Sequence, residues 1–257
     1  MKRWKAGLMV ALLAGMAGCA PMSQPVAKES VVHTLETAYR QAKDAKESAY
    51  RMETASLDAQ MDTGNWQREM MWEEGGATYE YIEYAHKDLP EEDAGFTLSR
   101  QQENTCLTIQ GTRTEDDFLM ESFWVEENTQ KAGMAVSALE PLLDVQDGTV
   151  RGVNPDYTFE QDGTEIRARL ADRARAEEEA LNREGDDLVA IKIERDEYEI
   201  AVDAQGALQR MKHVVARTYE DMDQAWPISQ ESTITKTGSF LSTAERAALI
   251  GLFDELP

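Results

Sequence analysis

Apolar residues alternate with charged ones over residues 189–193 and again over residues 198–202. Residues 203–206 (Asp-Ala-Gln-Gly) are typical of a turn, and residues 208–219 of the strand that returns from it. Each of these segments has one apolar side and one polar side. This pattern predicts an antiparallel sheet that is covered on one face and wet on the other.

The first half of the chain follows the same period of two. The alternation starts at Tyr50 and slips in phase near Ala55, which predicts a strand with a β-bulge that continues to Met61. Turn signals follow at residues 62–65 and 75–76, so neighbouring strands are expected to pair as in a meander. Strands are predicted over residues 50–61, 66–72, 78–84, 104–112, 118–125, 157–160, 164–170 and 232–238, with loops over residues 86–95 and around Trp226-Pro227.

Four segments have helical patterns instead. Apolar residues recur every three or four positions over residues 30–48, with Ser30 suited to the N-cap. Residues 133–143 show the same spacing, limited by Pro141, and the charged segment 171–184 reads as a surface helix. A capping box at Ser242 starts the last helix. The pattern as a whole predicts an α+β fold: a large curved antiparallel sheet with helices packed on one face.

The start of the chain has the features of a secretory signal. Residues 2–5 (Lys-Arg-Trp-Lys) include three basic side chains, residues 6–16 are apolar, and small residues precede Cys19. The apolar run is too short for a permanent membrane helix, which needs about 20 residues. The segment resembles a bacterial lipoprotein box, which implies cleavage before Cys19 and acylation of its thiol. We therefore predict a signal peptide over residues 1–18, a lipidated tether over 19–29 and one domain over 30–257.

The net charge of the chain excludes some classes of binding partner. The net charge is −23, and removal of Lys2, Arg3 and Lys5 with the signal would make it −26. A body this acidic is not expected to bind nucleic acid, because phosphate contacts need an excess of Lys and Arg. An anionic lipid surface would also repel it, so the acyl anchor is the expected means of attachment. The outer membrane and the outer face of a plasma membrane both remain open as its location.

Catalytic and metal motifs are not found in the sequence. None of the three histidines lies at helical spacing from another, and acidic pairs fall mainly at predicted turns, where solvation accounts for them. We predict neither an enzyme nor a cofactor, and no catalytic or metal residue. Cys106 lies in a strand-like segment, which favours a small buried hydrophobe over a reactive thiol.

Methionine and aromatic residues are concentrated in the first strands. Such side chains can line a cavity for an apolar ligand, but they can equally form the core beneath the helices, and the sequence leaves both possibilities open. The candidates for a ligand cavity are Met52, Met61, Trp66, Met70, Trp72, Tyr79, Tyr81 and Trp124.

The order of elements resembles the LolA/LolB and LppX/LprG group of bacterial lipoproteins and periplasmic carriers. The hairpin around Asp203 and Gly206 carries most of the likeness. The resemblance implies an unclosed half-barrel whose concave face holds acyl chains or hydrophobic peptide, in a carrier or a stress sensor. We therefore expect a lipid-anchored envelope protein that binds a hydrophobic ligand. The alternative is an interaction lipoprotein that presents acidic loops to an envelope partner, with Leu89 and Glu91 as candidate contacts.

Overall fold

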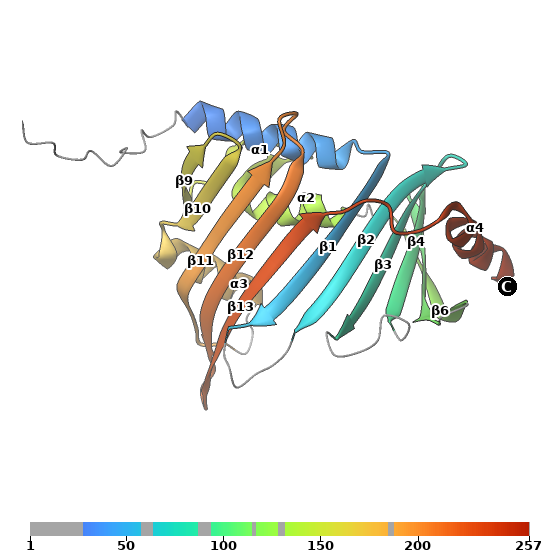
Figure 1. Cartoon of the computed structure of the whole chain (residues 1–257). Helices are drawn as coiled ribbons and strands as arrows, with labels where there is room; N and C mark the ends of the chain where they lie inside the picture. Colours follow the sequence, from blue (N-terminus) through green and yellow to red (C-terminus); the bar gives the residue numbers. More distant parts are fainter. Residues whose placement is uncertain are drawn as a thin grey trace, which may run out of the picture.

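An eleven-stranded antiparallel sheet forms the body of the protein (Figure 1). The computed structural model describes residues 28–57, 64–86, 94–114, 117–127, 132–184 and 188–256. The predicted signal peptide and Cys19 lie outside these residues. The strands of the large sheet are β1 Glu47–Ser56, β2 Asn65–Glu74, β3 Ala77–His86, β4 Gly95–Gln102, β5 Thr105–Arg113, β6 Phe118–Glu127, β9 Tyr157–Asp162, β10 Glu165–Leu170, β11 Ala190–Val202, β12 Leu208–Glu220 and β13 Ala225–Lys236.

The sheet consists of two meanders joined side by side. Its strand order is β6-β5-β4-β3-β2-β1-β13-β12-β11-β10-β9, so the first strand pairs with the last one. Strands β6 and β9 are the two ends of this order, and the sheet does not close between them. This confirms the predicted unclosed half-barrel. A separate hairpin, β7 Leu143–Gln146 and β8 Thr149–Val153, was not expected from the sequence.

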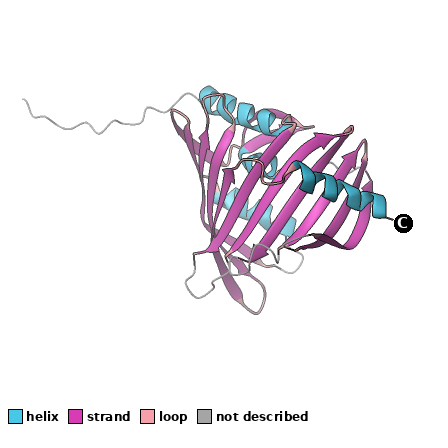
Figure 2. Ribbon diagram, turned by 45° about the vertical axis from the view of Figure 1, so that its right-hand side comes forward, coloured by secondary structure: helices cyan, strands magenta, loops and turns pink. Residues whose placement is uncertain are grey.

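The helices lie on both faces of the sheet (Figure 2). Adjacent residues of β1 define the faces: Tyr50 packs with α1 and α2, whereas Ala49 packs with α4. We call these the inner face and the outer face. Three helices cover the inner face, as expected, and α4 covers part of the outer face. The helices are α1 Lys28–Lys43, α2 Met134–Leu139, α3 Arg173–Glu184 and α4 Thr243–Gly251, with short 3-10 turns η2 Glu140–Leu142 and η3 Leu252–Glu255.

Three sequence predictions about these elements are corrected. The first helix ends at Lys43 rather than near residue 48, because β1 already begins at Glu47. The register between β1 and β13 is unbroken through Ala55, so no bulge lies there. The segment predicted as a loop around Pro227 is part of β13. Pro227 fits there because β1 pairs with β13 only from Gln230 onward, which leaves one side of β13 without a strand in the described sheet.

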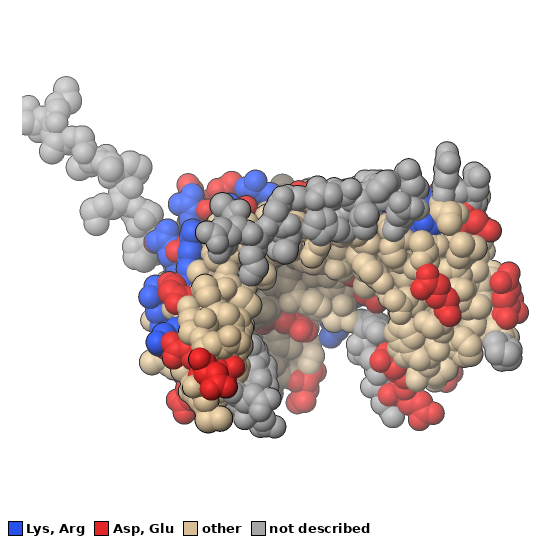
Figure 3. Space-filling model, turned by 90° about the horizontal axis from the view of Figure 1, so that it is seen from below, with Lys and Arg blue, Asp and Glu red and all other residues tan. Residues whose placement is uncertain are grey.

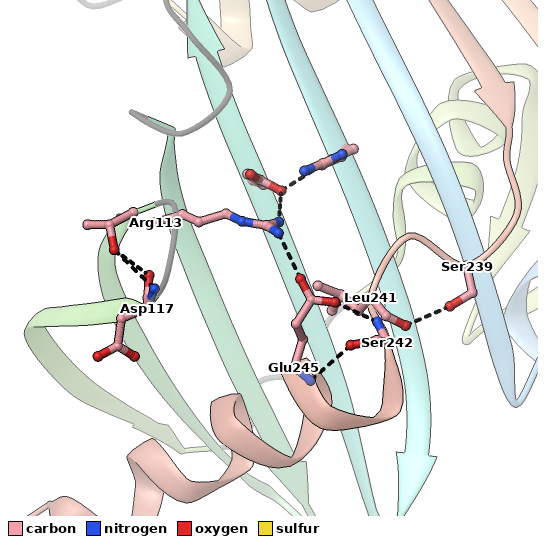
Figure 4. A network of polar contacts seen from close by, with 9 residues as sticks. Arg113, Asp117, Ser239, Leu241, Ser242 and Glu245 are labelled. Carbon is pink, nitrogen blue, oxygen red and sulfur yellow. Dashed lines mark hydrogen bonds and ion pairs between the residues drawn. The ribbon is translucent and has the colours of Figure 1, made fainter.

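The outer face is packed tightly against α4. Trp72 and Tyr79 stack with ring centroids 5.3 Å apart, and Phe253 of η3 lies 6.1 Å from Tyr79. An ion-pair network anchors the start of the helix (Figure 4). Arg113 Nη2 lies 2.8 Å from Glu245, and Arg113 Nη1 lies 3.4 Å from the fully buried Glu83. The helix is therefore held by both apolar packing and charge.

The capping box predicted at Ser242 is present. The Glu245 backbone N–H donates to Ser242 Oγ at 3.2 Å, and the Ser242 N–H donates to Glu245 Oε2 at 2.7 Å (Figure 4). We expect Ser242→Ala to lower the free energy of unfolding by about 1 kcal/mol, because one N–H at the start of the helix loses its acceptor. Urea denaturation measures this change. Thr243→Ala, at the exposed next position, is the control, and an equal loss in the control would contradict the role of the cap.

Acidic side chains are exposed on the surface seen from below. That view shows the molecule hollowed between two lobes, with Asp and Glu side chains on both of them (Figure 3). The distribution agrees with the excess of 49 acidic over 26 basic residues. No helix in the described part of the chain is long and apolar enough to cross a membrane.

Candidate ligand cavity

A cavity of 480 Å³ lies on the inner face, between the sheet and the helices α2 and α3. Its floor is formed by side chains of β1, β13, β12 and β11. Met52, Met211 and Ile234 occupy neighbouring positions across three of these strands and make the floor apolar. Small residues of the helices, including Ala138 of α2 and Ala176 of α3, form the opposite wall. The volume exists because these helical residues are too small to fill the space above the floor.

A polar cluster forms one part of the floor. Asp196 of β11 is only 4% exposed, and both of its carboxylate oxygens are engaged. His213 Nε2 lies 3.0 Å from Asp196 Oδ1, and Arg217 Nη2 donates to Oδ2 at 3.1 Å. A buried carboxylate requires this compensation, since an isolated charge in an apolar site is strongly unfavourable. The negative charge of Asp196 is therefore balanced within the cluster.

Two tyrosines extend the cluster along the cavity. The hydroxyl of Tyr198 donates to Tyr157, and the hydroxyl of Tyr157 donates to Asp196. Burial is the main cause that raises the pKa of both phenols, and the nearby carboxylate of Asp196 raises each pKa further. The ring of Tyr198 also stacks on His213, with centroids 4.0 Å apart. Both phenols consequently stay protonated, and the ring of Tyr198 packs against the imidazole of His213.

A β-bulge directs Asp196 into the cavity. Ile191 and Ile193 face inward at odd positions, but the register of β11 with β12 shifts between Ile193 and Arg195. After this extra residue the even positions Asp196 and Tyr198 face inward. Bulges commonly redirect side chains in this way beside functional sites. Sequence reasoning missed Asp196, although the change of phase between Ile193 and Tyr198 was a usable signal.

An ion pair closes one end of the cavity. Asp156 precedes β9 and is only 4% exposed, and its Oδ1 lies 2.8 Å from Arg175 Nε of α3. Arg175 also contacts Glu179 on the same helix at 3.2 Å. These contacts hold the helix against the loop before β9, so the wall of the cavity is fixed at this end. The polar groups around the cavity are thus paired with one another.

A second cavity of 410 Å³ lies beside it, under α1 and α2. Its lining includes Glu80, and the neighbouring Glu69 is only 3% exposed. Both oxygens of Glu69 accept from the backbone N–H of Met134 at 2.8 Å, and Glu69 and Glu80 share a hydrogen bond. Burial, reinforced by the charge of Glu80, raises the pKa of Glu69 to about 8. The pair therefore holds a shared proton at the first residue of α2.

The residues predicted to line a ligand cavity lie in three places. Met52 lines the 480 Å³ cavity. Trp124 lies on the edge strand β6 and is 38% exposed. The other five described candidates belong to the outer face, where four are core residues under α4 and the fifth has two arginine side chains over its ring. They are Met70, Trp72, Tyr79 and Tyr81, and Trp66 with Arg51 and Arg68 over its ring.

Met61, Leu89 and Glu91 lie outside the described residues, as does Cys19. Their predicted roles stay predictions. The buried position of Cys106 in β5 agrees with a small hydrophobe. Within the described ranges, no group of three or more His, Cys, Asp or Glu residues is placed to hold a metal ion.

Comparison with known proteins gives likeness of fold only. No family model and no curated protein matches the sequence. The structure is similar to that of the lipoprotein LppX of Mycobacterium tuberculosis, at 9% identity and a TM-score of 0.36, over 81% of this chain and 94% of that chain. A DUF1329 family protein from Desulfovibrio piger is similar at 11% identity and a TM-score of 0.28, over 84% and 98% of the two chains.

LppX is one of the proteins named in the resemblance expected from the sequence. A porin-like protein from Bacteroides uniformis is also similar, at 9% identity and a TM-score of 0.21, over 75% of this chain and 96% of that chain. These similarities concern the arrangement of strands. The function proposed below rests on the inner cavity.

Proposed function

We propose that the protein binds a hydrophobic ligand in the inner cavity, as a carrier or sensor anchored to a bacterial membrane through Cys19. The observation that carries this proposal is the 480 Å³ cavity between the sheet and its helices. Pockets for small molecules commonly have volumes of about 300–1,000 Å³, apolar walls and a few placed polar groups. The cavity has this volume, and its lining combines apolar side chains with polar ones, so an acyl chain that carries a polar end fits it.

The polar cluster would orient the ligand and supply little of its affinity. Asp196 already has two charged or ionisable partners, His213 and Arg217, so it offers no unbalanced charge to an ionic head group. The contacts that remain are apolar ones with Met52, Met211 and the helical alanines. Burial of apolar ligand surface contributes about 25 cal/mol per Å². Affinity should therefore grow with chain length.

Lipid analysis of the full protein purified from its native membrane tests the proposal. A defined apolar molecule that co-purifies with the protein, and exchanges with an added fluorescent fatty-acyl probe, would support it. Protein without any co-purifying molecule, combined with no binding of the probe, would overturn it. Steady release of hydrolysed ester would also overturn it, because His213 contacts Asp196 and pairs with Ser232 of β13, and these three residues would then act as a catalytic triad.

Filling the cavity should abolish ligand binding. Ala176 of α3 faces the cavity, whereas Ala174 of the same helix is exposed. We expect Ala176→Trp to weaken binding of the fatty-acyl probe at least tenfold, because the indole occupies the volume that the ligand needs. Ala174→Trp is the matched control and should bind as the wild type does. Equal binding by both variants, each with an unchanged melting temperature, would contradict the assignment of the cavity.

The alternative role, as a lipoprotein that presents acidic loops to a partner, depends on Leu89 and Glu91 and stays a prediction. Crosslinking from either position should capture one defined partner if this role is correct. Diffuse labelling would count against it. The ligand cavity is the better supported of the two roles, because all of its lining residues lie in the described part of the chain.

A further inference from the structure

The edge strand β6 carries an unusual amount of exposed apolar surface. Nine large hydrophobic side chains in the described part of the chain are exposed, and four of them lie on this one strand. Leu119 is 51% exposed and Val125 is 57% exposed, and Phe123 and Trp124 are exposed as well. The strand ends the sheet on this side, so its outer backbone edge has no strand partner among the described residues. Such an edge is a template for an added strand.

The opposite edge of the sheet is different. Strand β9 turns Tyr157 and Phe159 toward the core, where they pack beside α1 and the neighbouring strands. Its exposed positions are Thr158, Glu160 and Asp162, all polar. This edge is therefore protected in the usual way, by short length and charge. Strand β6 has ten residues, with a bulge at Glu121, and carries apolar side chains on both of its faces.

The acidic side chains on β6 indicate which kind of protein segment can bind there. Glu121, Glu126 and Glu127 lie among the apolar residues, and the chain has a net charge of −23. A second copy of the chain would bring the same acidic strand and the same net charge against this edge, which is unfavourable. A basic strand would instead be attracted to this edge. Glu126 and Glu127 are consecutive residues and lie on opposite faces of β6. Glu127 therefore shares its face with Phe123 and Val125, and a Lys or Arg opposite Glu127 would form a cross-strand pair beside apolar contacts.

We propose that β6 is a docking edge for an extended segment of a partner protein that carries both apolar residues and Lys or Arg. The segment adds to the sheet as a twelfth strand, antiparallel to β6. Backbone hydrogen bonds contribute affinity for any extended segment, whatever its sequence. The side chains of the segment determine which sequences bind most tightly. The unbroken part of β6, residues 122–127, offers about 20 Å of edge at about 3.4 Å per residue. This protein-binding role is independent of the proposed ligand cavity.

Labelled peptides test the proposal by fluorescence anisotropy with the full chain. A ten-residue peptide that alternates valine with lysine should bind, and its binding should weaken as salt rises. A peptide that alternates valine with glutamate should bind at least tenfold more weakly. A valine–lysine peptide with two central valines replaced by proline should lose binding, because proline cannot pair along a sheet edge. The proposal would be overturned if all three peptides bound equally well, or if none of the three bound.

Variants locate the binding on β6. Phe123→Lys combined with Val125→Lys should weaken binding of the basic peptide at least tenfold. Glu160→Lys on β9 changes the net charge by the same two units and should leave binding unchanged. Loss of binding in the β9 variant would overturn the assignment to β6, and circular dichroism shows whether each variant is folded. A dimer in sedimentation equilibrium that the β6 variant abolishes would mean that the occupant is a second copy, which overturns the partner assigned here.

Discussion

Glu83→Ala is expected to lower the free energy of unfolding by about 3 kcal/mol. Glu83 is fully buried on the outer face, and Arg68 Nε lies 2.6 Å and Arg113 Nη1 3.4 Å from its Oε2. Removal of the carboxylate leaves two largely buried guanidinium groups without the charge between them. Loss of one partner from a buried ion pair typically costs about 3–5 kcal/mol. Urea denaturation followed by tryptophan fluorescence measures the change.

Two further variants separate this effect from loss of charge in general. Glu53→Ala removes the partner of Arg51 from an exposed pair at 2.9 Å and should cost less than about 1 kcal/mol. The triple variant Arg68→Met, Glu83→Leu, Arg113→Met should recover much of the stability, because apolar side chains replace the whole network. A loss in Glu83→Ala no larger than that in Glu53→Ala would show that the network does not hold α4 in place.

Local patterns predicted most elements of the fold, but they missed strand β4 and the hairpin of β7 and β8. The alternation over residues 189–219 gave β11 and β12, and the capping box gave the start of α4. These signals depend on neighbours in sequence: side chains alternate along a strand, and a cap lies within one turn of its helix. The pairing of β1 with β13 depends on residues nearly 190 positions apart, such as Tyr50 and Lys236, and no local signal encodes it.

The candidate site was harder to predict than the fold. Alternation placed Trp72, Tyr79 and Tyr81 on one face, but it could not show that α4 would cover that face. The inner cavity depends on the bulge in β11, which brings Asp196 beside His213. One inserted residue reverses the facing of every later side chain. Such a site is fixed by strand register, which depends on the packing of the complete sheet.

Stability should depend on pH through Glu69. Its pKa is raised from 4.5 to about 8 in the folded protein, mainly by burial. Below pH 4.5 the carboxyl is protonated in both the folded and the unfolded chain, so it places no penalty on folding. Between pH 4.5 and about 8 the unfolded chain releases the proton while the folded chain keeps it. The free energy of unfolding should therefore fall by about 1 kcal/mol per pH unit across this range.

Glu69→Gln should remove this dependence and stabilise the protein at pH 8 by about 3 kcal/mol. The amide keeps the hydrogen-bonding pattern of the protonated acid: its oxygen accepts from the Met134 N–H, and its NH₂ group donates to Glu80. Unlike the acid, it has no proton to lose in the unfolded chain. Urea denaturation of the wild type and the variant at pH 5 and pH 8 measures the difference.

Glu73→Gln, at an exposed position of the same strand, is the control and should follow the wild type at both pH values. Parallel behaviour of wild type and Glu69→Gln between pH 5 and pH 8 would contradict the shared proton. A stabilised variant would instead show that the Glu69 and Glu80 pair opposes folding as the pH rises. Because Met134 is the first residue of α2, and Ala138 of α2 lines the inner cavity, the same pair would then connect proton uptake to the wall of the ligand site.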